Sequence, residues 1–214
     1  MAIEKLDTKL RQEQIAKATL ELVAKGGLDN LSMAAVAEKV GVVPSALYRH
    51  FKGKDELLDA ALGLVHDKLM ANAQAIRQET NEALQQLHGL LMRHVQLIRE
   101  NRGIPQIIFS QDLYVGHPER RTRVYQGIRA YLAEVAHIIR RGQQKRQIGR
   151  KIDPDTAAVM FLGLIQPSAI LWHMSNGDFN ISQQAQQAWP LYRKALENGA
   201  ASSRRKPQTQ PKGL

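Results

Sequence analysis

The chain has 214 residues, of which 43 % are hydrophobic and 5 % aromatic, so it is long enough to enclose a core in one or two domains. It contains no cysteine, which excludes structural disulfides, thiolate metal sites and cysteine nucleophiles. Its net charge of +10 suggests an anionic partner. The first residues are polar and the longest apolar run, 157–165, is too short to cross a bilayer, so we expect a cytoplasmic protein without a membrane partner.

The positive charge is unevenly distributed along the chain. Residues 1–60 hold nine Lys/Arg and nine Asp/Glu and are neutral overall, but residues 39–54 within them carry four bases and no acid. Residues 99–151 hold twelve bases against four acids, and residues 200–214 hold four bases and no acid. The last segment is also rich in Ser, Pro and Gln, and we predict that it is disordered.

The first predicted elements are helices. Apolar residues recur at helical spacing along almost the whole chain and no alternating strand pattern appears, so we predict an all-α fold. The first helix is expected to begin at Asp7 or Thr8 and to end at Gly26-Gly27, since glycine accepts the left-handed conformation at a helix C-terminus. Ser32 is a good N-cap for a short second helix.

A turn and two further helix starts follow. Gly41 is expected to end the second helix, and Pro44 or Ser45 to begin the third. Gly53 ends the third helix, and Asp55-Glu56 begin a fourth, where acidic residues are favourable. Residues 1–54 therefore form a compact three-helix unit.

Longer helices are predicted in the remainder, which forms a larger helical body over residues 55–199 followed by the basic tail 200–214. The expected helices cover about 81–99, 105–114, a long one from 118, 154–174 with a kink at Pro167, and 182–198 capped by Ser182. The apolar stripe of the long helix is predicted to contain Arg121, Tyr125, Ile128, Leu132, Val135 and Ile139.

Residues 32–51 fit a helix-turn-helix by length. On its second helix, Leu47 and Phe51 are four apart and can pack inward. The opposite, outward face is formed by Ser45, Tyr48, Arg49 and Lys52. Small residues at its start would allow a close approach to base edges, and the later hydroxyl and cationic groups suit phosphates. The alternative is a solvated helix and loop with ordinary surface charge.

The same residues resemble the DNA-binding domain of TetR-family transcriptional regulators. The shared pattern is Gly41, the small patch Pro44-Ser45-Ala46, Leu47-Tyr48-Arg49-His50-Phe51, Lys54 and Glu56-Leu57. The resemblance covers roughly residues 12–62, and the rest agrees in length and helix order without a specific motif. It implies a sequence-specific DNA-binding regulator, most often a repressor that a small molecule releases from a palindromic operator in double-stranded DNA.

The resemblance also implies roles for matching positions. Phosphate contacts are implied for Ser32, Tyr48, His50 and Lys54. Contact with the major groove is implied for Val43, Pro44, Ser45, Ala46 and Arg49. Arg49 suits either guanine or a phosphate, and His50 suits either phosphate binding, which we favour, or a pH-sensitive role. Val43 and Pro44 stand where the family often has a polar residue, so thymine methyl groups or DNA shape would supply more of the specificity.

A homodimer is expected, because one short recognition helix covers only a few base pairs. In the family, the last two helices, here 154–174 and 182–198, form a four-helix bundle across the two-fold axis. Close packing is allowed by Gly163, Ser168 and Ala169, and a stripe is formed by Ala185, Ala188, Trp189, Tyr192, Ala195 and Leu196. The alternative is that this stripe only fills the core of the monomer.

An effector pocket is implied for the body at about 75–175. The candidate lining residues are Met70, His94, Phe109, Tyr114, Tyr125, Met160 and Trp172, although such residues at helical spacing are also ordinary core. The arginines at 120, 121, 123 and 129 could attract an anionic effector such as an acyl-CoA, or form a solvated face. Ligand binding is expected to shift the fourth helix and change the separation of the recognition helices, which half-sites fix at roughly 34 Å.

An enzyme is not predicted, because the sequence has no Gly-rich phosphate loop, no His-Glu-x-x-His and no Ser/His/Asp cluster. No cofactor or metal site is predicted either, since the histidines lack ligand spacing. The remaining alternative is a non-specific architectural DNA-binding protein driven by the basic body and tail.

Overall fold

The structure, a computed structural model, describes residues 2–111, 113 and 116–201. Within them it contains helices and no strand, which confirms the predicted all-α fold. The helices are α1 (Ala2–Gly26), α2 (Met33–Val40), α3 (Pro44–Tyr48), α4 (Lys54–Glu79), α5 (Ala83–Glu100), α6 (Gly103–Ile108), α7 (Pro118–Gln144), α8 (Pro154–Gly163), α9 (Gln166–Met174) and α10 (Ile181–Ala201).

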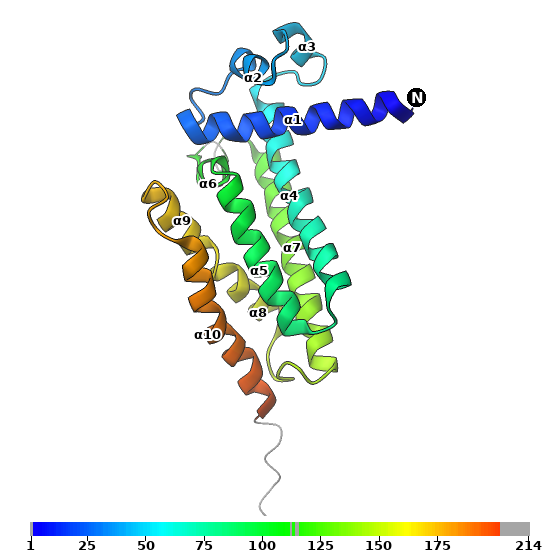
Figure 1. Cartoon of the computed structure of the whole chain (residues 1–214), viewed down its shortest axis with the longest axis vertical. Coiled ribbons are helices and arrows are strands. Elements are labelled where there is room, and N and C mark those ends of the chain that lie inside the picture. Colours follow the sequence, from blue (N-terminus) through cyan, green and yellow to red (C-terminus); the bar gives the residue numbers. More distant parts are fainter. Residues whose placement is uncertain (1, 112, 114–115, 202–214) are drawn as a thin grey trace, which may run out of the picture.

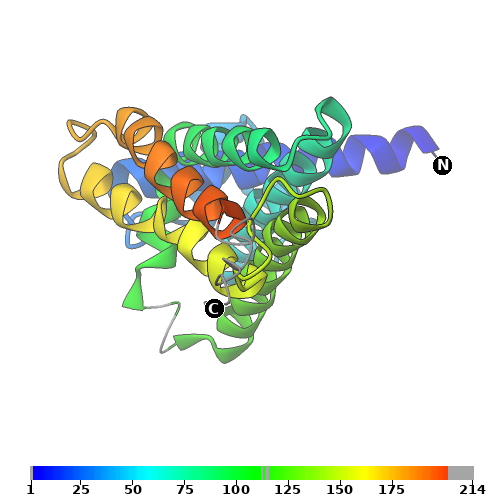
Figure 2. The ribbon, with the colours of Figure 1, turned by 90° about the horizontal axis from the view of Figure 1, so that it is seen from below.

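The molecule is elongated, with α1–α3 forming a head at one end of the helical body (Figure 1). Helix α4 leaves the head and continues down the body beside α5 and α7, which it contacts. Viewed along the long axis, α10 lies beside α5, and α8 lies against α7 (Figure 2). The hydroxyl of Tyr192 on α10 donates to the carbonyl oxygen of Ala157 on α8 at 2.7 Å, so the last helices form one unit with the body.

Two hydrophobic cores share α4. The head core joins α1, α2 and α3 to the start of α4 through fully buried residues such as Val36, Leu47 and Leu57. The body core joins α5, α7, α8, α9 and α10, and the second half of α4 adds Ala73 to it. One unbroken helix therefore enters both cores and connects the head to the body.

Several element boundaries differ from the sequence prediction. Helix α1 already includes Ala2, because the segment before Asp7 has no helix breaker and good helix formers. The N-cap of α10 is Asn180, whose side-chain oxygen accepts a hydrogen bond from the amide of Gln183 at 3.0 Å, whereas Ser182 accepts one from Arg99. Helix α10 also extends to Ala201, two residues into the segment predicted to be disordered; the rest of that segment lies outside the described residues.

The segment 154–174 is interrupted where a kink was predicted. It forms two helices, α8 and α9, separated at Leu164 and Ile165, with Pro167 in the first turn of α9. By length and composition alone Pro154–Met174 could cross a membrane, and 39 % of its most apolar stretch is buried in the molecule. Its buried residues, among them Phe161 and Trp172, belong to the body core.

The buried face of α7 differs from the prediction in the first half of the helix, whereas Val135 and Ile139 are fully buried as predicted. Arg121 and Tyr125 are exposed, and the buried positions in the first half of the helix are Arg120 and Tyr131. The true stripe follows the spacing 120, 124, 127, 131 and 135, in which a half-buried glycine occupies the middle position.

Candidate DNA interface and effector cavity

Local hydrogen bonds fix both ends of α2. The Ser32 hydroxyl accepts a hydrogen bond from the amide of Ala35 at 3.1 Å and caps α2, as predicted. Gly41 ends α2 with φ of 76°, a left-handed conformation that a side chain disfavours. Ser32 thus fixes the start of α2, and Gly41 fixes the turn that leads to α3.

Helix α3 has the two faces that the spacing predicted. Leu47 is fully buried and Phe51 nearly so, and both belong to the head core. Exposed side chains on the other face are Ser45, Tyr48, Arg49 and Lys52, and Val43 and Pro44 before them are exposed as well. Ala46 and His50 are half-buried. The regular helix ends at Tyr48, with Arg49 as its C-cap, so it is shorter than the predicted segment to Gly53.

The link from α3 to α4 is held from both sides. The amide of Lys52 donates to the Glu56 carboxylate at 2.7 Å. The ammonium of Lys54, predicted to contact phosphate, donates to the carbonyl oxygen of Leu28 between α1 and α2 at 2.5 Å. Lys54 therefore has a structural contact within the head. Its ammonium has further N–H donors, which are available to a phosphate.

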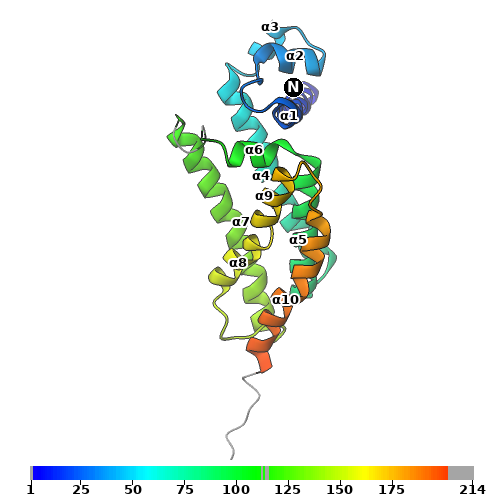
Figure 3. The ribbon, with the colours of Figure 1, turned by 90° about the vertical axis from the view of Figure 1, so that its left-hand side faces the viewer.

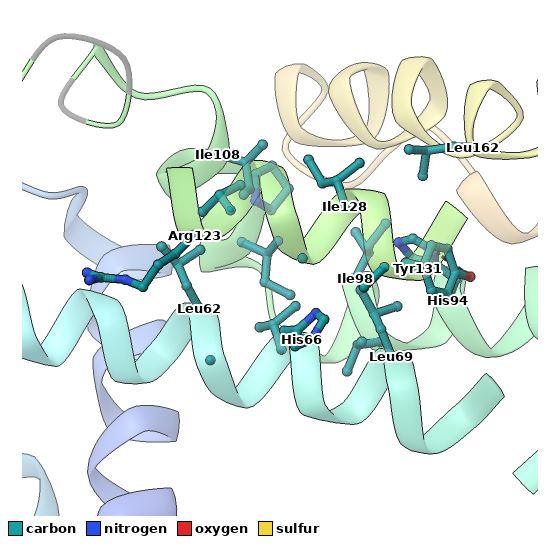
Figure 4. Close-up of a pocket in the computed structure, with 18 of the residues that line it drawn as sticks. Leu62, His66, Leu69, His94, Ile98, Ile108, Arg123, Ile128, Tyr131 and Leu162 are labelled. Carbon is teal, nitrogen blue, oxygen red and sulfur yellow. Dashed lines mark hydrogen bonds between the residues drawn. The ribbon is translucent and has the colours of Figure 1, made fainter. Parts of the chain in front are cut away.

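A cavity of about 520 Å³ lies in the body between α4, α5, α6, α7 and the α8–α9 junction. Its walls are largely aliphatic, with Leu62, Leu69, Ile98, Ile108, Ile128 and Leu162 among the lining residues (Figure 4). The volume and lining are typical of a small-molecule site. Gly127 gives His66 room to lie against α7, since a Cβ there would be only 3.1 Å from the His66 Nδ1 atom.

One end of the cavity carries a buried neutral pair. His94 Nδ1 and the Tyr131 hydroxyl are 3.1 Å apart, with the two rings edge to face. Burial lowers the pKa of His94 to about 4, so this imidazole is uncharged at neutral pH. Burial also raises the pKa of Tyr131, so its hydroxyl keeps its proton. This end therefore offers hydrogen bonds without a net charge.

The other end, next to the head, is an ion-pair cluster between α4 and α7. Arg120 is 2 % exposed and donates from Nε to Asp59 at 2.8 Å and from Nη2 to Asp55 at 2.8 Å. Arg123 also binds Asp59, and His117 lies 3.3 Å from Asp55. The hydrogen bond from Arg120 holds the pKa of Asp55 below its ordinary value. We call Asp55, Asp59, Arg120 and Arg123 the α4–α7 clamp.

The sequence prediction of effector-lining residues finds only part of this cavity. His94 and Phe109 line it. Met70, Tyr125 and Met160 do not, because Met70 packs against the body core and the other two are exposed on the surface. Trp172 lies in a separate, more open surface depression, under Arg102, and Tyr114 lies outside the described residues.

The sequence did not lead us to predict the ion pairs of the clamp or the place of Tyr131 in the cavity. Arg120 was expected either to attract an anion or to lie on a solvated face, because the predicted stripe of the first half of α7 is one residue out of phase. Asp55 and Asp59, four residues apart on α4, were the available signal for a cation bridging to them. Of the four arginines suggested to attract an anion, Arg120 and Arg123 line the cavity, whereas Arg121 and Arg129 are exposed and do not.

The predicted dimer stripe on α10 is mostly core. Ala185, Trp189, Tyr192 and Leu196 are buried in the body of their own chain, as are Ser168 and Ala169 on α9. The exposed large apolar side chains on these helices are instead Val159, Met160, Ile170, Leu171, Met174 and Leu191. We call these six residues the apolar face; Gly163 and Ala195, on α8 and α10, are exposed as well.

Two family models match the chain. The model described as bacterial regulatory proteins of the tetR family matches residues 15–61, and the model described as tetracyclin repressor-like, C-terminal domain, matches residues 80–196. Curated relatives include the nucleoid occlusion factors SlmA of Haemophilus influenzae and Yersinia enterocolitica. The first is 21 % identical over 87 % of this chain and 86 % of its own length, and the second 24 % identical over 88 % and 96 %.

Similar solved structures share the fold over most of this chain. The fatty acid degradation regulator FadR from Bacillus halodurans has a TM-score of 0.73 at 19 % identity, over 86 % of this chain and 95 % of that chain. The transcriptional regulator FadR from Bacillus subtilis, solved in complex with stearoyl-CoA, has a TM-score of 0.71 at 20 % identity, over 85 % and 97 %. A putative TetR-family regulator from Rhodococcus sp. has a TM-score of 0.72 at 24 % identity, over 87 % and 98 %.

Proposed function

Because the chain belongs to the TetR family of bacterial regulatory proteins, we propose that it is a cytoplasmic repressor that binds a palindromic operator as a homodimer and is released by a small-molecule effector. The proposal assigns it no enzymatic activity. The observation that carries the proposal is the division of α3 into a buried anchor, Leu47 with Phe51, and an exposed face that contains Tyr48 and Arg49. A helix anchored in this way presents a rigid edge to the major groove.

DNA contacts are proposed for the residues around α3. Val43 and Pro44, both exposed, would lie against base edges and thymine methyl groups, with Ser45 and Ala46 behind them. Tyr48, His50 and Lys52 would contact phosphates. Arg49, at the C-cap of α3, is the candidate for reading guanine through its two-pronged guanidinium.

Selection of duplexes from a random-sequence pool tests this assignment. We expect the wild type to enrich a palindrome whose half-sites are about one helical turn apart. Arg49→Ala should relax the preference at one base pair, whereas Lys52→Ala should weaken binding to all duplexes alike. Uniform weakening by Arg49→Ala would make it a phosphate contact, and no enriched sequence at all would overturn the repressor proposal.

The apolar face is the proposed dimer interface. Met174 and Leu191 are each 74 % exposed, on α9 and α10, and neighbouring Gly163 and Ala195 allow close approach of a second chain. An exposed face of this kind is a common mark of an association surface. We expect Met174→Lys with Leu191→Lys to give monomers in sedimentation, while Leu10→Lys, an exposed apolar residue of α1, leaves the dimer intact. A dimer unchanged by the double variant would exclude this face.

The effector is proposed to be an elongated, mainly apolar molecule with an anionic end. The aliphatic middle of the cavity would hold its body, and the neutral His94–Tyr131 pair would bind an uncharged polar group. At the end next to the head, an anion would compete with Asp59 for Arg123, which is the more exposed of the two arginines that hold Asp59. The stearoyl-CoA bound to the Bacillus subtilis FadR supports a ligand of this class.

Release from DNA would follow from the loss of the clamp. Asp55 and Asp59 lie in the first two turns of α4, directly after the link to α3. An effector anion that displaces the Asp59 carboxylate from Arg123 would loosen α4 from α7 and change the position of the head. Binding of the effector would therefore weaken binding of the operator. By the same coupling, bound DNA must lower the affinity for the effector by the same factor.

Calorimetric titration with palmitate, hexadecanol and palmitoyl-CoA tests the ligand class. We expect the anions to bind the wild type more tightly than the alcohol, and Arg123→Gln to remove that preference without abolishing binding of the alcohol. Arg129→Gln is the matched control, because Arg129 lies on the same helix outside the cavity. Equal binding of all three ligands by the wild type would overturn the exchange at Arg123.

A non-specific nucleoid protein is the second candidate. The long, low-identity match to proteins named nucleoid occlusion factors and the excess of basic residues in the body favour it. The affinity ratio between a selected duplex and a random one at fixed salt distinguishes the two. A ratio above about 10³ supports the repressor, and a ratio near one supports the second candidate.

A further inference from the structure

Two segments of the chain hold most of the net charge of +10. Residues 140–155 hold six Lys/Arg and two Asp/Glu, and residues 200–214 hold four Lys/Arg and no acid, so each segment contributes +4. The loop between α7 and α8 lies against the end of α10, where the amide of Gly149 donates to the carbonyl oxygen of Leu196 at 3.0 Å. Figures 1 and 3 show that loop and the end of α10 at the far end of the body from α3.

The exposed cations of this loop are Lys145, Arg146, Arg150 and Lys151, and Lys145 donates to the carbonyl oxygen of Asn81 at 3.1 Å. We call Arg146, Arg150 and Lys151, together with the half-buried Arg141, the basic pole. Among the residues that the structure describes, none of the four forms an ion pair with a carboxylate, whereas the adjacent Arg140 binds Asp155 at 2.6 Å. No direct ion pair therefore neutralises the charges of the basic pole.

The loop that presents these cations is firmly fixed. Ile148 is fully buried in the body core. The Gln143 side chain donates to the carbonyl oxygens of Gly149 and Ile152, at 2.9 and 2.7 Å. The Gln147 side chain accepts from the amide of Ala83 at 2.8 Å. The charges thus project from a defined surface with little further ordering needed on binding.

Arg146 occupies a backbone position that disfavours it. Its φ is 60°, in the left-handed region where glycine or asparagine is the low-energy choice. This left-handed residue terminates α7, where the amide of Gln147 donates to the carbonyl oxygen of Gly142 at 2.8 Å.

We propose that the basic pole is a second DNA-binding surface, which holds a further segment of duplex by its phosphates, without reading sequence, while α3 binds the operator. Three of its four cations are arginines, whose guanidinium groups match phosphate geometry. A duplex presents one negative charge per about 1.7 Å, which suits several fixed cations in a row. No large apolar side chain between 140 and 155 is exposed, so the surface lacks the groups that insert into a lipid interface. This inference goes beyond the proposed repressor function and does not depend on it.

A charge-matched pair of variants tests the proposal. The pole variant is Arg146→Gly/Arg150→Gln/Lys151→Gln, and the control is Lys68→Gln/Arg99→Gln/Arg129→Gln, which removes the same net charge from other parts of the body. Both are made with Arg49→Ala/Lys52→Ala, so that the head contributes little. The Arg146→Gly change relieves the left-handed strain, so the pole variant should melt no lower than its parent.

Binding to a random-sequence 40-base-pair duplex is measured between 50 and 200 mM salt. If the three residues each contact a phosphate, the slope of log affinity against log salt becomes shallower by about 2.7 in the pole variant. The fold-loss of affinity between 50 and 200 mM salt is then about 40 times smaller for the pole variant than for its parent. The control should keep the slope of its parent. In a second assay, a duplex is fixed to beads and loaded with protein whose head is intact. This bound protein should capture a second, labelled duplex. The same protein carrying the three pole substitutions should not.

Two results would overturn the proposal. The first is equal slopes for the pole variant and the control. The second combines two findings: the parent binds vesicles of 30 % phosphatidylglycerol in phosphatidylcholine and the pole variant does not, while the salt slope of duplex binding is the same for both. That outcome would assign the surface to a membrane. Selection of an operator by α3 is measured separately, so failure of either idea leaves the other intact.

Discussion

Replacing Arg120 with methionine should destabilise the protein far more than a surface charge does. Methionine keeps much of the aliphatic packing but removes the guanidinium that holds Asp55 and Asp59 on α4 to α7. Arg120 is 2 % exposed, so its guanidinium lies almost entirely within the contact between α4 and α7. The change isolates the ion-pair part of the contact between the two helices.

The expected magnitude follows from the exposure of the two partners. Asp59 is 30 % exposed, and a hydrogen bond to a charged group of this burial contributes about 1.5–3 kcal/mol. Asp55 is 61 % exposed, so screening by solvent limits its bond to about 1 kcal/mol or less. Asp59 keeps Arg123 in the variant, which reduces the cost. We therefore expect the free energy of unfolding to fall by about 2–3 kcal/mol.

Urea unfolding of a double-mutant cycle measures the effect. The cycle combines Arg120→Met with Asp59→Asn, and Arg129→Met is the surface control, expected to change stability by less than about 0.5 kcal/mol. The coupling energy of the pair should be at least about 1 kcal/mol. A fall for Arg120→Met no larger than for the control, or a coupling near zero, would refute the view that the clamp ties α4 to α7.

The clamp also predicts a pH dependence. The folded-state pKa of Asp55 is lowered by Arg120, so its contribution to stability is fully present above its unfolded pKa of about 3.9 and is lost as pH falls through the lower folded value. The difference in stability between the wild type and Arg120→Met should therefore be constant from pH 7 to about 5 and shrink in stronger acid. A difference that grows in acid would contradict this sign.

Three other predictions concern single residues. His94 has a folded pKa of about 4 against about 6.5 unfolded, so the unfolded state binds the extra proton first; wild-type stability should fall by about 3 kcal/mol between pH 6.5 and 4, and His94→Gln should lack that part of the fall in unfolding curves at each pH. Gly103→Ala should cost more than about 2 kcal/mol in urea unfolding, because its Cβ would overlap the carbonyl oxygen of Leu20 on α1. Gly63→Ala, in an open position on α4, should instead stabilise by about 0.5–1 kcal/mol. Equal effects of the two substitutions would count against the close approach of α6 and α1. Gly41→Ala should cost about 1 kcal/mol through its φ of 76° alone, since no atom lies within 4 Å of the added Cβ, and Gly41→Asn should cost less by the same measurement.

The sequence by itself determined the local structure of the head. Ser32, Gly41 and the four-residue spacing of Leu47 and Phe51 depend on hydrogen bonds and contacts within a few residues, and each has its predicted place. Caps, turns and the face of a short helix are set by neighbours in the chain. For the same reason Pro167 marked the interruption between α8 and α9.

Only the tertiary structure decided which residues meet in the body. The phase of a long helix such as α7 depends on the helices packed around it, so Arg120 and Tyr131 replaced Arg121 and Tyr125 on the buried face. The stripe on α10 had two possible partners, its own body or a second chain, and packing against α5 and α8 assigned most of it to the core. The basic pole likewise required the fold, because a count of charges along the chain does not place the loop after α7 beside the end of α10.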